Sequence, residues 1–368
     1  MIHFETYKER SVEGRYVTLD SLQKTWLNTL DSSFVETIGS SVQGKDIFCV
    51  TLGSGPKKVL MWSQMHGNES TTTKAVLDLV NYLIADEEFG KSILKGCTIC
   101  IVPILNPDGA KAYTRVNANE VDLNRDAKNR TQPETIVLRE LFERFQPDFC
   151  FNLHDQRTLF SAGTQNNPAT VSFLSPSNNP ERTIDQTRSI AMQLIVAMNR
   201  TLQNHIPGQV GRYDDGFNEN CIGDTFQLLG VPTILFEAGH YKEDYQREET
   251  RKYIFMALTE VLEVISKNRI AEFPHQEYFD IPENEKLFFD TLIKNAHLIN
   301  ESLSANQQVG IQFVETLKDE SIDFVPEVAK VGELSGSFGH TTLDCSISSQ
   351  MEQIERKNLL WLIRDIKS

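Results

Sequence analysis

The sequence predicts an α/β protein with a mixed, mostly parallel central sheet, helices on both faces, and a smaller β-rich C-terminal domain. Apolar strand-like runs alternate with helix-like segments between residues 57 and 267, the pattern of an α/β layer structure. After a Pro-containing connector near residue 275, short alternating runs typical of strands take over. A chain of 368 residues can hold one large and one small domain. We therefore expect domains at 1–272 and 273–368.

The individual elements follow from their hydrophobic periodicity and their turn signals. The run "KKVLMWSQM" is continuously apolar, which is typical of a strand in the middle of a sheet. The helix after it has Ser70 as its expected N-cap, and Pro133 fits the first turn of a later helix. Expected strands are a hairpin at 34–55, then 57–65, 97–105, 148–154, 231–239, 309–317, 321–332 and 336–343. Expected helices are 21–31, 70–89, 133–145, 183–203, 244–267 and 286–300, with a long polar loop at 106–126.

Composition argues against several classes of partner. The net charge of −15 disfavours binding to nucleic acid or to anionic membranes. No run of about 18 apolar residues and no signal-peptide core is present, which predicts a cytoplasmic protein. Cys97 and Cys100 have a CxxC spacing, but they lie in an apolar run and no second pair completes a four-cysteine metal site. We read them as buried thiols, and the sequence sets no oligomeric state.

Polar side chains stand where three predicted strands end. His66 and Glu69 follow the strand at 57–65, His154 ends the strand at 148–154, and Glu237 lies near the end of the strand at 231–239. Any one of these residues alone is more often a satisfied polar side chain than a ligand. In open α/β sheets, however, ligands bind at the carboxyl ends of the strands. Four such residues together favour a functional site.

Two histidines and one carboxylate are a ligand set for catalytic zinc, with the fourth position left for water. The short HxxE spacing lets one turn present His66 and Glu69 to the same ion. A zinc ion held by His66, Glu69 and His154 would lower the pKa of its water and polarise a carbonyl group. Glu237 would then be the general base that takes the proton of the water.

The polar loop at 106–126 offers groups that bind anions. Arg115, Asn124 and Arg125 could grip a substrate carboxylate and stabilise an oxyanion. The alternative is a solvated loop whose arginines pair with Asp122 and Asp126.

These motifs, in this order, resemble the zinc carboxypeptidase family: "MHGNE", "NPDGAKAYTR", "VDLNRD", "LHD" and "ILFEAG". The resemblance covers roughly residues 30–265. It implies that His66, Glu69 and His154 bind one zinc ion and that Glu237 is the base. It also implies that Arg115 polarises the scissile carbonyl, that Asn124 and Arg125 bind the terminal carboxylate, and that Asp122 holds the other nitrogen of His66.

Two further positions rest on the resemblance alone. Tyr213 stands at about the spacing of the tyrosine that closes over the substrate in digestive relatives, and it could equally be a surface tyrosine. Asp224 lies near the floor of the specificity pocket, where an acid would suit a basic side chain, or it could cap a helix. His240 either lines the site or caps a turn.

The sequence also departs from the digestive enzymes. Asn68 replaces the usual arginine, and "HGNE" is the version seen in the aspartoacylase and succinylglutamate desuccinylase branch. We expect a zinc metallocarboxypeptidase acting on small peptides with a free carboxylate. The alternatives are an N-acyl amino acid deacylase of that branch, and, with less support, a non-catalytic binding protein on the same fold.

Overall fold

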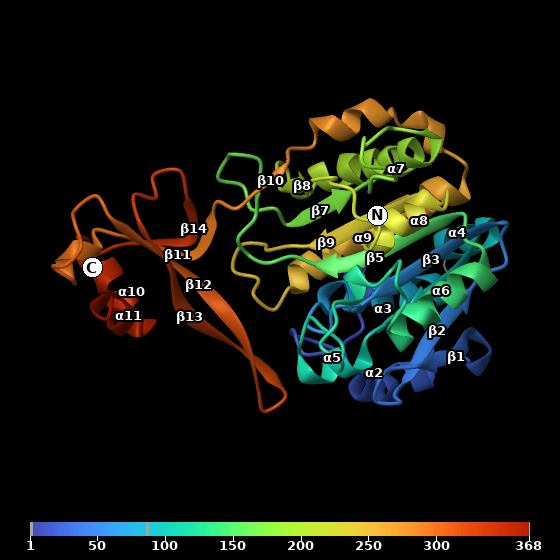
Figure 1. The fold of residues 1–368 in the computed structure, drawn as a ribbon, viewed down its shortest axis with the longest axis horizontal. Helices are drawn as coiled ribbons and strands as arrows, with labels where there is room; N and C mark the ends of the chain where they lie inside the picture. Colours follow the sequence, from blue (N-terminus) through green and yellow to red (C-terminus); the bar gives the residue numbers. More distant parts are fainter. Residues whose placement is uncertain (1–2, 86–87, 368) are drawn as a thin grey trace.

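The computed structural model describes residues 3–85 and 88–367, which form two main sheets of different size (Figure 1) and a third of two short strands, β6 and β10. The larger sheet has eight strands in the order β1-β2-β4-β3-β5-β9-β7-β8. A separate sheet of four strands, in the order β13-β12-β11-β14, lies beside it. The α/β class and the smaller β-rich unit are therefore confirmed.

The bounds of the elements are as follows. The strands are β1 (Val35–Ser40), β2 (Asp46–Leu52), β3 (Lys57–Ser63), β4 (Cys97–Val102), β5 (Phe149–Asp155), β6 (Ser161–Ala162), β7 (Val171–Leu174), β8 (Val210–Arg212), β9 (Thr233–Ala238), β10 (Asn284–Glu285), β11 (Phe288–Lys294), β12 (Gln308–Lys318), β13 (Ser321–Gly332) and β14 (Phe338–Asp344). The α-helices are α1 (Phe4–Tyr7), α2 (Leu19–Thr25), α3 (Thr71–Ile84), α4 (Glu88–Gly96), α5 (Pro107–Ala112), α6 (Pro133–Phe145), α7 (Gln186–Gln203), α8 (Ile222–Leu228), α9 (Glu248–Ser266), α10 (Ser348–Arg356) and α11 (Leu360–Arg364). The 3-10 helices are η1 (Leu27–Thr29), η2 (Ser32–Phe34), η3 (Leu123–Arg125), η4 (Ile270–Glu272), η5 (His275–Asp280) and η6 (Ala296–Leu298).

The centre of the large sheet is parallel. β3 pairs in parallel with β4 and β5, and β5 pairs in parallel with β9. The outer pairs β1–β2, β2–β4 and β7–β9 are antiparallel. Because β3, β5 and β9 run in the same direction side by side, their carboxyl ends meet at one edge of the sheet.

Helices cover both faces of this sheet, and β3 shows why. Its side chains alternate between the faces: Val59 and Met61 join a core with α3, α7 and α9, whereas Leu60 and Trp62 join a core with α6 and α8. Both sets are fully buried, so the four central positions of the strand, 59–62, are all apolar. This explains the continuous apolar run that predicted a central strand.

Some predicted elements needed correction. The helix predicted for 70–89 ends at Ile84, and 86–87 lie outside the described residues. Ser70 precedes this helix but makes no capping hydrogen bond; Asp155 instead accepts from the amides of Thr71 and Thr72, at 2.9 and 3.2 Å. The polar loop contains the short helix α5, whose N-cap is Asn106, and the 3-10 helix η3.

The helix predicted for 286–300 is wrong, because β11 occupies Phe288–Lys294 as an inner strand of the small sheet. The apolar run "FFDTLI" is too short for its periodicity to distinguish a helix from a strand. It forms a strand because it pairs with β12 on one side and β14 on the other. The three later strands are confirmed, and β12 and β13 are long. The sequence prediction missed α10 and α11.

Residues just after the predicted domain boundary pack with the large sheet. Tyr278 and Ile281 belong to its core, η5 lies against α7, and β10 pairs with β6. The division at 272/273 stays a prediction. No helix in the described part of the chain has the length and apolar character needed to cross a membrane.

Candidate metal centre

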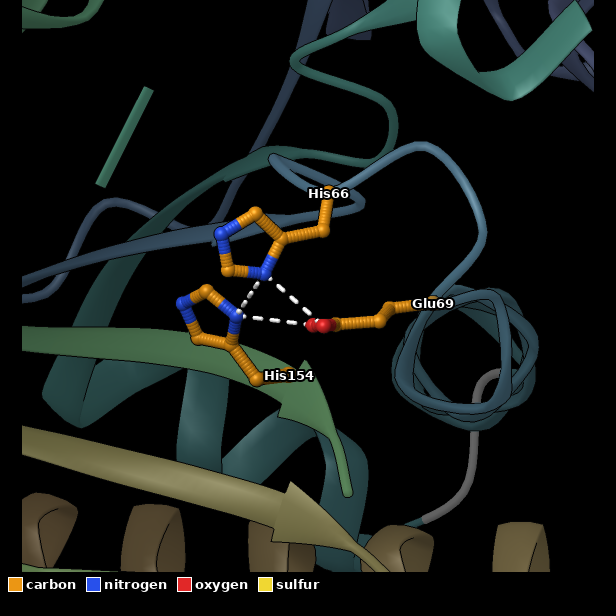
Figure 2. Close-up of side chains that lie close together, drawn as sticks. All are labelled: His66, Glu69 and His154. Atoms are coloured by element: carbon orange, nitrogen blue, oxygen red, sulfur yellow. Dashed lines mark hydrogen bonds and ion pairs between the residues drawn. The ribbon is translucent and has the colours of Figure 1, made fainter. Parts of the chain in front are cut away.

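His66, Glu69 and His154 converge at the carboxyl edge of the large sheet, as Figure 2 shows. One ligand atom from each lies within 4.8 Å of the others. Nδ1 of His66 is 2.8 Å from Oε1 of Glu69, and Nδ1 of His154 is 2.8 Å from Oε2 of the same carboxylate. The two Nδ1 atoms are 3.0 Å apart. All three side chains are buried.

The turn after β3 aims His66 and Glu69. Gln64 has a positive φ of 49°, an uncommon conformation for a residue other than glycine. Its side chain holds the turn, because Nε2 donates to the carbonyls of Val17 and Gly67, both at 2.8 Å. A Cβ at Gly67 would lie 1.9 Å from the backbone of Gly109, so only glycine fits there. The "HGNE" motif thus combines two ligand candidates with a close backbone contact.

Asp122 fixes the orientation of the His66 ring on the side away from Glu69 and His154. Nε2 of His66 donates to Oδ1 of Asp122 at 3.0 Å, which leaves Nδ1 with its lone pair facing Glu69 and His154. Arg115 donates to the other oxygen of Asp122 at 3.0 Å and to Oε1 of Glu69 at 3.4 Å. Two imidazole lone pairs and a carboxylate directed at one point are a donor set that fits a zinc ion.

Glu237 lies beside this set because β5 and β9 are parallel neighbours and His154 is opposite Glu237 in their register. Its Oε2 is buried and makes no hydrogen bond to the described residues. Loss of water contact raises the pKa of Glu237 well above its usual range, and the negative charges of Glu69 and Asp155 add to the effect. Burial also opposes ionisation of Glu69, but His66 and His154 outweigh it and lower its pKa. Two neighbouring carboxyl groups thus have opposite proton affinities, as in sites of acid–base catalysis.

A cavity of about 890 Å³ joins these residues to the other predicted ones. Arg115, Asn124, Arg125, Tyr213 and Asp224 all line it, together with the metal-binding trio and Glu237. Asp122 lies behind His66, outside the lining.

Asn124 and Arg125 stand next to the start of α8. Oδ1 of Asn124 accepts from the amide of Ile222 at 3.0 Å, and Arg125 donates to Sγ of Cys221 at 3.1 Å. Arg125 is exposed and forms no ion pair within the described residues. The alternative of a loop with internally paired arginines fits Arg115, which binds Asp122, but not Arg125.

The positions that rest on resemblance alone also face this cavity. Burial and the nearby charge of Glu237 raise the pKa of Tyr213. Burial raises the pKa of Asp224 to about 6, although the amide of Asn218 donates to its carboxylate. His240 lies outside the lining, with its ring 4.7 Å from that of Tyr245 and 4.0 Å from that of His340.

The sequence did not predict several of the residues that line the cavity. Asp155 directly follows His154, and its amide donates to Glu69 at 3.2 Å, so its place in "LHD" was a usable signal. Arg15 and the strands β12 and β13 also line the cavity. They lie far along the chain from the motifs, and no local pattern marks them.

An α/β sheet with a His–Glu–His set and a buried carboxyl group at its carboxyl edge defines a metallohydrolase type of site. The family model for zinc carboxypeptidases matches residues 19–226, more than half of the chain. The chain belongs to the zinc carboxypeptidase family.

Individual relatives are distant. The chain is 32% identical to Carboxypeptidase 2 of Trichophyton tonsurans over 108 residues, which cover 29% of this chain and 19% of that protein. It is 28% identical to Carboxypeptidase M of Mus musculus over 201 residues, which cover 47% of this chain and 45% of that protein. The chain therefore spans from 19% to 45% of the length of these curated relatives. A metallo-carboxypeptidase structure from Pseudomonas aeruginosa aligns with a TM-score of 0.53 at 17% identity, covering 69% of this chain and 70% of that one, which shows the shared fold.

Proposed function

We propose that this protein is a zinc-dependent hydrolase that cleaves an amide bond next to a free carboxylate, acting as a metallocarboxypeptidase on small peptides. The observation that carries the proposal is the shared cavity. It brings a three-residue metal-binding set, an unpartnered buried carboxyl oxygen of Glu237, and the cations Arg115 and Arg125 to one space. The family membership supports the same reaction class.

His66, Glu69 and His154 would hold one zinc ion. When bound, the ion would polarise the carbonyl group of the substrate and lower the pKa of the attacking water. Glu237 takes a proton from the attacking water and later delivers it to the leaving amine. Its raised pKa suits the first step, because a carboxylate with little water contact is a stronger base.

The remaining residues position the substrate. Arg125 and Asn124 bind the terminal carboxylate, and Arg115 stabilises the negative charge that develops on the carbonyl oxygen. Asp224, in the first turn of α8, would face the C-terminal side chain of the substrate, and Tyr213 would cover the bound residue.

An N-acyl amino acid deacylase is the second candidate, and one observation favours it. Part of the cavity wall comes from the C-terminal sheet, through β12 and β13. A pocket shielded by the C-terminal sheet suits a small acyl amino acid, whereas a peptide substrate would favour an open groove. The two candidates share the metal and the base and differ in what lies beyond the amide bond.

Hydrolysis of a substrate panel tests the proposal. The panel holds C-terminally free dipeptides and tripeptides and N-acyl amino acids, given to the zinc-loaded protein. Glu237→Gln should lower kcat by about 10² to 10⁴-fold, the usual contribution of a general base. The exposed Glu301→Gln is the matched control and should keep the wild-type rate. Turnover of acyl amino acids alone would select the deacylase, and a Glu237→Gln variant as active as wild type would overturn the proposal.

A further inference from the structure

The β12–β13 hairpin of the C-terminal sheet forms one wall of the catalytic cavity. In Figure 1 this hairpin lies beside the large sheet, on the side towards which the arrows of β5 and β9 point. The cavity lining includes Phe313, Glu315, Phe324, Glu327, Val328 and Ala329 from the hairpin.

The hairpin has an inner and an outer face. Phe324 lines the cavity, whereas Val325, the next residue of the strand, does not and is 41% exposed. Successive side chains of a strand point to opposite faces. On the Val325 face, Val314, Glu327 and Ala329 also border the cavity, but Val325 itself does not.

A buried ion pair fastens the hairpin to the catalytic unit. Nη1 of Arg15 is 2.9 Å from Oε1 of Glu315, and only 4% of the Arg15 side chain is exposed. The hydroxyl of Tyr113, which follows α5, donates to the other oxygen of Glu315. A buried ion pair with a further hydrogen bond fixes geometry, because separating it would leave a charge without a partner.

Asp290 of β11 makes a second attachment. It is fully buried and accepts from Nε2 of Gln312 and the amide of Phe313, both at 2.7 Å, and from the hydroxyl of Tyr245 at 2.9 Å. Tyr245 belongs to the catalytic unit, and its ring lies 5.2 Å from Phe313 and 5.3 Å from Phe324. The wall is therefore held at two places.

The carboxylate-binding candidates belong to a different wall. Asn124 and Arg125 are bound to residues at the start of α8, whereas the hairpin is bound to Arg15, Tyr113 and Tyr245. A substrate whose carboxylate lies beside α8 must extend from the metal centre towards some other wall. The cavity of about 890 Å³ is of the size that encloses small ligands.

We propose that the β12–β13 hairpin is a fixed wall that limits the substrate on the amino side of the scissile bond, so that the enzyme accepts dipeptides, tripeptides and short N-acyl amino acids but not longer peptides. This inference rests on the proposed hydrolase function. It makes the hairpin a determinant of substrate length, and it makes Arg15 and Glu315 positioning residues for that wall.

The test is a ladder of peptides of two, three, five and eight residues that share their last two residues. In the wild type, kcat/KM should fall at least about tenfold from three to five residues, the effect of a steric overlap. Phe324→Ala should reduce that fall, because it opens the wall. Val325→Ala, on the outer face of the same strand, should keep the wild-type ratio.

A second variant, which narrows the cavity instead of widening it, keeps the proposal testable if Phe324→Ala does not fold. Phe324 lines the cavity, so Phe324→Trp narrows the space and keeps an aromatic side chain at that position. It should lower kcat/KM for the tripeptide more than for the dipeptide. Calorimetric binding of the same peptides to Glu237→Gln gives a second readout that needs no turnover, and Kd should rise with length in the same order.

The outcomes separate this inference from the proposed function. Equal kcat/KM along the ladder, with Phe324→Ala unchanged, would overturn the wall and leave the hydrolase in place. Binding that weakens with length but without hydrolysis of any peptide would support the wall and overturn the proposed peptidase. Neither binding nor hydrolysis would overturn both.

Discussion

At the scale of single residues, the candidate metal centre depends on side chains that are not among the three candidate ligands. Asp122 is the main one, because it accepts from His66 and from Arg115 and so fixes both side chains. The pattern in the sequence predicted this role only through family resemblance, since Asp122 lies 56 residues beyond His66. The ligand candidates were easier to predict because each lies at the end of a recognisable strand or in the turn just after it.

Asp122→Ala should weaken zinc binding by about 10 to 100-fold, the usual cost of losing the acceptor behind a ligand histidine. His66 would then be free to rotate and to bind a proton on either nitrogen. Competition with a chelating dye measures the affinity. Asp323→Ala, an exposed aspartate on β13, is the control and should bind zinc like the wild type. Equal affinities for both variants would contradict the role of Asp122.

At the scale of elements, buried charges join α3 and α9 beneath the sheet. Arg251 of α9 donates to both oxygens of Asp78 of α3, at 2.6 Å each, and both side chains are fully buried. Glu248, one turn earlier on α9, binds Lys74 of α3 at 2.5 Å and Lys8 at 3.0 Å. Hydrophobic periodicity predicts both helices, but it cannot predict which buried charges meet, because the partners lie more than 170 residues apart.

Asp78→Ala should destabilise the protein by about 3–5 kcal/mol, because Arg251 would remain buried without its partner. Urea unfolding followed by circular dichroism measures the free energy of unfolding. Thr98→Ala serves as a comparison in which only one hydrogen bond, to the carbonyl of Gly55, is lost. It should cost only about 1 kcal/mol. If Asp78→Ala costs no more than Thr98→Ala, the buried pair does not hold the helices together.

The charges around Glu248 predict a dependence of stability on pH. Burial alone would raise the pKa of Glu248, but Lys74 and Arg251 outweigh it and lower the pKa from 4.5 to about 2. A lowered pKa in the folded state means that the stabilisation is present above pH 4.5 and is lost as the pH falls towards 2.

Unfolding of the wild type and of Glu248→Gln at pH 6 and pH 3 tests this expectation. The wild type should be the more stable protein at pH 6, and the difference between the two should shrink at pH 3. A difference that does not change with pH would contradict it.

At the scale of the whole molecule, the catalytic unit and the C-terminal sheet share a wall of the active site. The α/β class and the β-rich C-terminal unit could be predicted, because alternation and periodicity are local signals. The docking of the hairpin could not, because Arg15 and Glu315 are 300 positions apart and each looks like an ordinary surface charge in the sequence. The mistaken helix at 286–300 has the same origin, since β11 becomes a strand through its neighbours in the small sheet.

Asp290→Ala should loosen the docking of the C-terminal sheet, because it removes a buried acceptor of bonds from both units. We expect a loss of about 2–4 kcal/mol in the free energy of unfolding. Limited proteolysis should also cut β12 and β13 faster than in the wild type. Asp323→Ala again provides the control. Unchanged cleavage in both variants would show that Asp290 does not hold the units together.

The position of the hairpin also sets the order in which the active site is completed during synthesis. A ribosome adds residues in chain order, at about 5–20 per second. His66, His154 and Glu237 therefore leave the ribosome before any residue of β12 or β13 has been made. For roughly 4 to 20 seconds after Glu237 is added, the groups proposed for catalysis exist without the wall that we propose restricts their substrates. The last part of the cavity to be made is the part that limits what can enter it.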